Sequence, residues 1–125
     1  ISELKINNLY GLNKSKLLMT EPLGYIDFLR LVKNASAVIT DSGGVQEETT
    51  FLGVQCITMR NNTERPVTVE VGTNRITGTN IEEVKKSVYE VLNGNIKKGS
   101  IPELWDGKTA QRIAKIITEK FSVAN

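Results

Sequence analysis

The chain contains no histidine and only one cysteine among its 125 residues. Without histidine it lacks the most common general acid or base and the most common metal ligand. Any chemistry must therefore use carboxylates, lysines or groups outside the chain. The single cysteine, Cys56, excludes an internal disulfide and fits a reducing, cytoplasmic setting. Because Cys56 lies in the apolar run 56–59, we expect a buried structural thiol rather than a nucleophile.

The sequence also lacks a long apolar run and an excess of charge of either sign. No run approaches the ~18 residues of a membrane span, and the first residues do not have the layout of a signal peptide. Sixteen Lys and Arg against 14 Asp and Glu give a net charge of +2, with the two signs interspersed. A nucleic-acid-binding surface usually needs a concentrated basic face. We therefore expect no membrane and no nucleic-acid partner, and we interpret the pair Lys97-Lys98 as part of a solvated loop.

What is present is an alternation of short apolar runs and helical spacing, in a composition typical of one globular domain. Four runs are expected to be buried strands, at 16–20, 37–40, 56–59 and 74–77. Between them, helical spacing covers 25–34, 45–52 and 66–71. Such alternation predicts an α/β fold with a parallel sheet and right-handed crossovers.

Two further helices are expected in the second half of the chain, at 81–92 and 108–121. Asn80 is a plausible N-cap of the first, and Asn93-Gly94 a plausible stop. The loop between them should be attached to the domain by Ile101, Leu104 and Trp105. At the other end, the chain starts at Ile1 without Met, as though a helix had been entered midway. This suggests a fragment or an expressed subdomain, and a processed or omitted Met would look the same.

A candidate anion site follows the expected strand 37–40. Residues 40–48 predict a strand end, a glycine-containing turn and a helix start. The free N–H groups of the first helical turn and the helix dipole favour a phosphate there, and two glycines leave it room. Ligands of open α/β sheets bind at this edge of the sheet. Taken alone, Ser-Gly-Gly equally fits a tight turn in which Asp41 or Ser42 caps the helix, and it matches neither common glycine-rich nucleotide motif.

Glu48 favours the ligand-binding interpretation. Gly44 and Glu48 are four residues apart and therefore lie on one face of the expected helix. A carboxylate there can accept hydrogen bonds from both vicinal hydroxyls of a ribose whose phosphates occupy the turn. Glu47 points elsewhere and is interpreted as a first-turn charge that complements the helix dipole.

A second polar segment, residues 60–66, follows the expected strand 56–59 and so leaves the same edge of the sheet. Pro66 is expected early in a helix, with Thr63 or Arg65 just before it. Arg60 and Arg65 are candidates for pairing with a phosphate or a nucleotide, with ordinary surface arginines as the alternative.

Five ordered motifs resemble those of the non-hydrolysing UDP-N-acetylglucosamine 2-epimerases. They are Pro22–Phe28, Thr40–Glu48, Asn62–Pro66, Gly72–Asn74 and Ile101–Lys108. The resemblance covers nearly the whole chain but only the C-terminal domain of the family. It implies a Rossmann-like parallel sheet with flanking helices, as one half of a two-domain, glycosyltransferase-B-type enzyme. It also implies interconversion of UDP-GlcNAc and UDP-ManNAc, by elimination of UDP and its addition back to the other face at C2.

In that family the C-terminal half binds UDP, and its members tend to form homodimers through contacts outside this region. Nothing in the sequence resembles a metal site, and no cofactor is expected. The UDP-binding residues that the motifs imply are Ser42, Gly43 and Gly44 for the diphosphate, Glu48 for the ribose hydroxyls, Arg65 for the nucleotide, and Leu23 and Phe28 for the uracil.

The sequence departs from the family in two respects. Gln55 stands where proline is common, and because it begins a strand we expect a small effect on stability and no loss of binding. The acidic groups that would move the C2 proton, the phosphate contacts of the N-terminal domain and an interdomain histidine belong to regions missing here. We therefore expect this chain alone to bind UDP without catalysis. Two alternatives are the nucleotide-sugar-binding half of a related glycosyltransferase and a stand-alone, non-catalytic nucleotide-binding domain.

Overall fold

A computed structural model describes residues 17–121 and divides the chain into two compact units, Ile1–Arg30 and Leu31–Asn125. The boundary falls inside helix α2 (Tyr25–Asn34), whose limits are those expected from the sequence. The helical start expected before Leu12, and Lys16 of the first expected strand, lie outside the described residues. None of the helices in residues 17–121 combines the length and the apolarity of a membrane span.

The second unit contains a parallel sheet with the strand order β1-β2-β3. Its strands are β1 (Ala37–Thr40), β2 (Gln55–Thr58) and β3 (Asn74–Ile76). The strand ends are in register, with Thr40 opposite Thr58 and Thr58 opposite Ile76. The segments that follow the three strands therefore leave from one edge of the sheet. The prediction of an α/β fold with a parallel sheet is confirmed.

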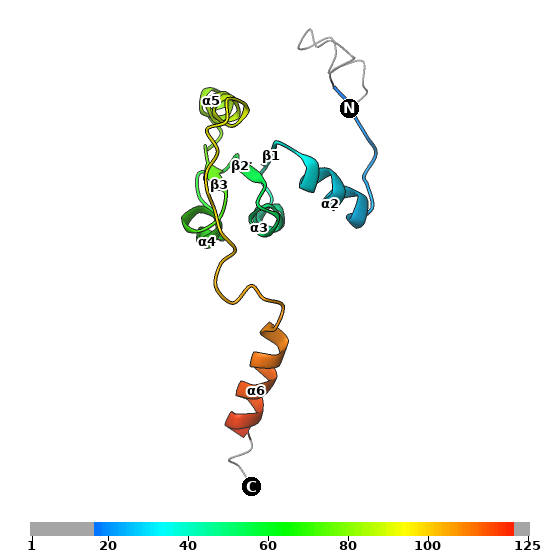
Figure 1. The fold of residues 1–125 in the computed structure, drawn as a ribbon, viewed down its shortest axis with the longest axis vertical. Helices are drawn as coiled ribbons and strands as arrows, with labels where there is room; N and C mark the ends of the chain where they lie inside the picture. The colour runs from blue at the N-terminus through cyan, green and yellow to red at the C-terminus, as the bar shows by residue number, and fades with distance from the viewer. Residues whose placement is uncertain (1–16, 122–125) are drawn as a thin grey trace. The chain divides into compact units, whose positions relative to one another are not determined.

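Helices cover both faces of this sheet (Figure 1). Helices α3 (Gly43–Leu52) and α4 (Pro66–Glu70) lie on one face, and α5 (Ile81–Leu92) lies on the other. Helix α6 (Thr109–Phe121) follows at the end of the described chain. The expected limits of α5 are confirmed, and Asn80 caps it, because Asn80 Oδ1 accepts a hydrogen bond from the N–H of Glu82 at 2.9 Å.

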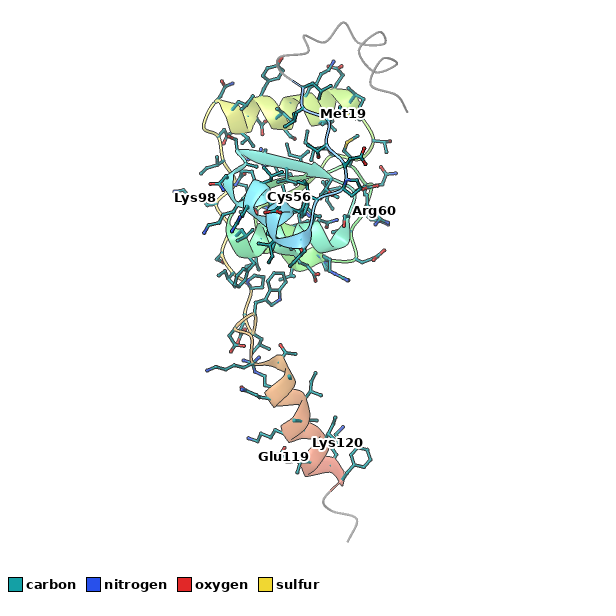
Figure 2. All side chains as sticks on the ribbon, turned by 90° about the vertical axis from the view of Figure 1, so that its right-hand side faces the viewer. Met19, Cys56, Arg60, Lys98, Glu119 and Lys120 are labelled. Atoms are coloured by element: carbon teal, nitrogen blue, oxygen red, sulfur yellow. The ribbon has the colours of Figure 1, made fainter. Side chains whose placement is uncertain are left out.

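The core is centred on β2, between the two helical layers. Figure 2 shows Cys56 in the interior, and both Cys56 and Ile57 are completely buried. Burial raises the pKa of the Cys56 thiol, against a smaller lowering by hydrogen bonds with Thr49 and Thr58. The thiol therefore stays protonated at neutral pH, and the expectation of a buried structural cysteine is confirmed.

Two expectations about local structure are wrong. Leu17–Thr20, the described part of the first expected strand, form no strand. An apolar run becomes a strand only when a neighbouring strand completes its hydrogen bonds, which composition alone does not reveal. In the loop before α6, Ile101 and Leu104 are exposed, whereas Pro102 is buried. Trp105, the third residue expected to attach the loop, is half-buried. Pro102 and Trp105, rather than Ile101 and Leu104, therefore attach this loop to the domain.

The interpretation of Lys97 as a solvated loop residue is also wrong. Its backbone N–H donates to Gln55 Oε1 at 2.8 Å, and Gln55 Nε2 donates to the Lys97 carbonyl at 2.9 Å. The Lys97 ammonium donates to the carbonyl oxygens of Val69 and Asn74. Burial, and then the nearby charge of Arg75, lower the pKa of Lys97. Gln55 therefore fastens residues 95–100 to the start of β2, which a proline could not do because it has no side-chain amide.

We expect Gln55→Ala to lower the free energy of unfolding by about 1–3 kcal/mol, because it leaves two partly buried backbone groups of Lys97 without partners. Urea denaturation measures this change. Gln111→Ala, at an exposed position of α6, is the matched control and should change the free energy by less than about 0.5 kcal/mol. Equal midpoints for Gln55→Ala and the parent chain would contradict the assignment.

Candidate functional site

In the segment between β1 and α3, the N–H of Ser42 donates to Thr40 Oγ1 at 3.0 Å, but several other polar groups are free. Ser42 is the N-cap residue of α3, with extended backbone (φ −84°, ψ 127°), but its side chain makes no capping hydrogen bond. Within residues 17–121, the N–H groups of Gly43, Gly44 and Val45 also have no partner, and the first internal bond of the helix runs from the N–H of Gln46 to the Ser42 carbonyl at 3.3 Å. The alternative in which Ser42 caps the helix with its hydroxyl is therefore wrong.

Gly43 and Gly44 are the first two residues of α3, and neither has a positive φ. A Cβ on Gly43 would meet nothing within 4 Å, and one on Gly44 would meet only Ser42 Oγ at 4.0 Å. Neither backbone conformation nor packing therefore requires glycine here, although glycine in a helix costs roughly 0.5–1 kcal/mol relative to alanine. What the two glycines provide is open space above unpaired N–H groups, which is the geometry of an anion site.

Glu48 lies in the same helix, one turn beyond Gly44, as expected. Its side chain is half-buried, and within the described part of the chain its carboxylate has no ion pair or hydrogen bond. The carboxylate is thus available on the face that carries Gly44. In the same part of the chain, no group of three or more His, Cys, Asp or Glu could hold a metal ion.

Arg65 contacts this helix through Glu47, not through Glu48. Arg65 Nε lies 2.9 Å from Glu47 Oε1, and both side chains are partly exposed. The interpretation of Glu47 as a first-turn charge is wrong, because Glu47 is in the second turn of α3 and pairs with Arg65. Partly exposed ion pairs contribute only about 0–1 kcal/mol. Arg65 can therefore exchange this partner for an anionic ligand at small cost.

The ion pair shows that segments 41–48 and 60–66 meet at one edge of the sheet, as the sequence predicted. Arg60 is also partly exposed, but its guanidinium pairs with Glu64 of its own segment, at 3.8 Å, and not with α3. Figure 2 shows Arg60 and Lys98 at opposite ends of the sheet, so Lys98 lies away from the edge that carries Arg60. Of the expected uracil contacts, Leu23 precedes α2 and Phe28 lies within it, and both belong to the first unit.

A group of buried polar side chains beneath the site was not predicted from the sequence. Gln46 is 1% exposed, and Thr58, Thr68 and Asn74 are completely buried. Thr58 Oγ1 donates to Asn74 Oδ1 at 2.6 Å, which joins β2 to β3. A signal was present in α3, where Gln46, Thr49 and Thr50 occupy positions i, i+3 and i+4 and form the buried face.

Comparisons with known proteins match this chain to one family. A family model described as UDP-N-acetylglucosamine 2-epimerase matches residues 3–118. The UDP-N-acetylglucosamine 2-epimerase of Methanocaldococcus jannaschii is 49% identical over 117 residues, which are 92% of this chain and 31% of that protein. The chain therefore spans about a third of the length of this relative.

Solved structures with bound ligands also align with the chain. The UDP-GlcNAc 2-epimerase of Methanocaldococcus jannaschii in complex with UDP-GlcNAc and UDP aligns with a TM-score of 0.70 and 47% identity, over 93% of this chain and 32% of that one. The Staphylococcus aureus protein MnaA with UDP aligns with a TM-score of 0.78 and 30% identity, over 93% of this chain and 33% of that one.

Proposed function

The chain belongs to the UDP-N-acetylglucosamine 2-epimerase family, and from this premise we propose that it is the UDP-binding C-terminal domain of such an enzyme. The observation that carries the proposal is the pair Gly43 and Gly44, which stand in helical backbone with open space above them. The stability of the fold does not require glycine at either position. The close approach of a phosphate to the backbone does require it, because a side chain would occupy the same space.

Each group at the site has a distinct task in this proposal. The N–H groups of the first turn and the Ser42 hydroxyl donate hydrogen bonds to the diphosphate. The Glu48 carboxylate, one turn further along α3, accepts hydrogen bonds from the ribose hydroxyls. Arg65 leaves Glu47 and pairs with the nucleotide. Leu23 and Phe28 of the first unit are proposed to frame the uracil.

The reaction of the whole enzyme is part of the same proposal. Elimination of UDP and the C2 proton from UDP-GlcNAc gives an unsaturated sugar, and UDP then adds back to C1 while a proton adds to the opposite face of C2 to form UDP-ManNAc. No histidine is available in this chain to move a proton. In the family that the motifs resemble, the acid–base groups belong to a separate N-terminal domain, to which we assign them, and we expect these 125 residues alone to bind UDP without epimerising UDP-GlcNAc. Turnover at the rate of a full-length family member would refute this division.

The test of binding is Gly44→Ala. We expect the variant to be as stable as the parent or up to about 1 kcal/mol more stable, because the added methyl group enters open space in a helix. We expect it to bind UDP roughly 10- to 100-fold more weakly, because the methyl group displaces the phosphate from charge-assisted hydrogen bonds. Isothermal titration calorimetry and urea denaturation measure the two effects.

Uridine is the control ligand for this variant. Because uridine has no phosphate, its affinity should be equal for the parent and for Gly44→Ala. Loss of uridine affinity together with UDP affinity would place the diphosphate elsewhere. If the folded parent chain gave no heat with UDP and no amide shifts in residues 42–48, UDP binding by this chain would be disproved.

A further inference from the structure

A closed ring of hydrogen bonds surrounds the backbone of Arg65. The N–H of Arg65 donates to Thr63 Oγ1 at 3.0 Å, and Thr63 Oγ1 donates to Gln46 Oε1 at 2.6 Å. On the other side, Thr68 Oγ1 donates to the Arg65 carbonyl at 2.7 Å and accepts from Asn74 Nδ2 at 3.0 Å. Asn74 Nδ2 also donates to Gln46 Oε1 at 3.1 Å, which closes the ring.

Fold stability alone does not account for this ring. Gln46 and Asn74 are at most 1% exposed, at positions where apolar side chains would avoid the cost of burying amides. The cost is not fully compensated, because Gln46 Nε2 has no hydrogen-bond partner within the described residues. A polar residue that is retained in the core at a net cost points to a role in placing something specific.

The ring fixes Arg65 relative to the anion turn. Gln46 belongs to α3, the helix that begins at Gly43, and its N–H bonds to the Ser42 carbonyl. Thr63 and Asn74 are 17 and 28 residues away from Gln46 in the sequence. The same carboxamide oxygen therefore ties both the loop before α4 and the start of β3 to the helix that carries the turn.

Consecutive residues of α3 hold the two parts of Arg65. Gln46 acts on its backbone through Thr63, and Glu47 pairs with its guanidinium group. The guanidinium is held by a partly exposed ion pair, whereas the two bonds to the Arg65 backbone are partly buried and continue to the buried side chains of Gln46 and Asn74. Arg65 can thus change partners with its side chain while its main chain stays in place.

We propose that Gln46, Thr63, Thr68 and Asn74 are positioning residues, which hold Arg65 so that its guanidinium and the Ser42–Gly44 turn contact one UDP molecule together. This proposal rests on the proposed function, because UDP is taken as the ligand. Holding a binding group in place before the ligand arrives removes part of the ordering cost of binding, so loss of the ring weakens binding without removing a ligand contact.

The experiment uses Thr63→Val, which removes the linking hydroxyl at a position less buried than Gln46. We expect UDP affinity to fall about fivefold. Thr63→Ser keeps the hydroxyl and should restore the affinity. Thr73→Val is the matched control: it also removes a hydroxyl that donates a bond of 2.6 Å, but to the Val54 carbonyl outside the ring. It should lower stability and leave UDP affinity unchanged.

A double-mutant comparison separates positioning from general loosening. Arg65→Ala alone should weaken UDP binding by about 10- to 100-fold. In that background Thr63→Val should have no further effect, because its contribution acts only through the Arg65 side chain. Equal losses of affinity in Thr63→Val and Thr73→Val, or a full fivefold loss in the Arg65→Ala background, would overturn the proposal.

Hydrogen exchange, measured without ligand, tests the hydrogen-bond ring independently of UDP binding. In Thr63→Val, hydrogen exchange of the Arg65 amide should accelerate at least about fivefold, because its acceptor is gone, and Thr73→Val should not change it. Unchanged exchange in Thr63→Val would overturn the ring by itself. Accelerated exchange in Thr63→Val, together with no UDP binding by the parent chain, would support the ring and reject the proposed function.

Discussion

Gly72→Ala is expected to lower the free energy of unfolding by about 3 kcal/mol, because the added methyl group has no room. Its Cβ would lie 2.4 Å from Thr50 Oγ1 and 2.6 Å from the carbonyl oxygen of Thr68. Thr50 is almost completely buried, and the Thr68 carbonyl belongs to the backbone of α4, so neither atom can withdraw easily. Urea denaturation followed by circular dichroism measures the change.

The matched control is Gly44→Ala, the same substitution in open space, for which we expect unchanged or higher stability. Because Thr68 also belongs to the ring around Arg65, Gly72→Ala should weaken UDP binding even at temperatures where the variant is fully folded. Equal denaturation midpoints for the two glycine variants would show that the space around Gly72 is not limiting.

Glu48→Ala is expected to weaken UDP binding by about 10- to 100-fold. Hydrogen bonds to a charged group contribute about 1.5–3 kcal/mol, and in the proposed site two ribose hydroxyls donate to this one carboxylate. The stability of the fold should change little, because within residues 17–121 the Glu48 carboxylate has no partner to lose. Calorimetric titration of the folded variant with UDP measures the loss.

The control ligand for this variant is the 2′-deoxy form of UDP, which lacks one of the two hydroxyls. The parent chain should bind it more weakly than UDP, and Glu48→Ala should reduce its affinity much less than that of UDP. Glu83→Ala, which removes an exposed carboxylate from α5 on the other face of the sheet, should affect neither ligand. An equal loss for both ligands in Glu48→Ala would place the ribose away from Glu48.

The elements of the fold were largely predictable because their signals are local. Helix α5 has its N-cap at Asn80 and a positive-φ glycine, Gly94, just beyond its end, and both signals lie within a few residues of the helix. The apolar runs in the sequence predicted the limits of β1, β2 and β3 to within one residue at each end. The prediction of a strand for the apolar run ending at Thr20 was wrong, because a strand also needs a neighbouring strand, which the run itself does not specify.

Helix α3 shows where apolar patterning misleads. Its apolar residue Phe51 is 54% exposed, whereas its buried face consists of Gln46, Thr49 and Thr50. A rule that assigns apolar residues to the core therefore selects the wrong face of this helix. Thr63 and Asn74, which are far away in the sequence, donate to the Gln46 carboxamide oxygen, and Thr49 donates to carbonyls of its own helix. Within the described residues, Gln46 Nε2 and Thr50 Oγ1 have no partner.

The sequence by itself determined the α/β alternation, the turn at Ser42–Gly44, the placement of Glu48 one turn beyond it and the resemblance to the epimerase family, because each depends on residues close together in the chain or on motif order. The tertiary structure decided that Glu47 pairs with Arg65, that Gly44 has free space whereas Gly72 has none, and that Gln46 closes a ring around Arg65. These features depend on the register of the strands, which brings together residues that are separated by 17 to 28 positions in the sequence. Their contacts exist only once the sheet has formed.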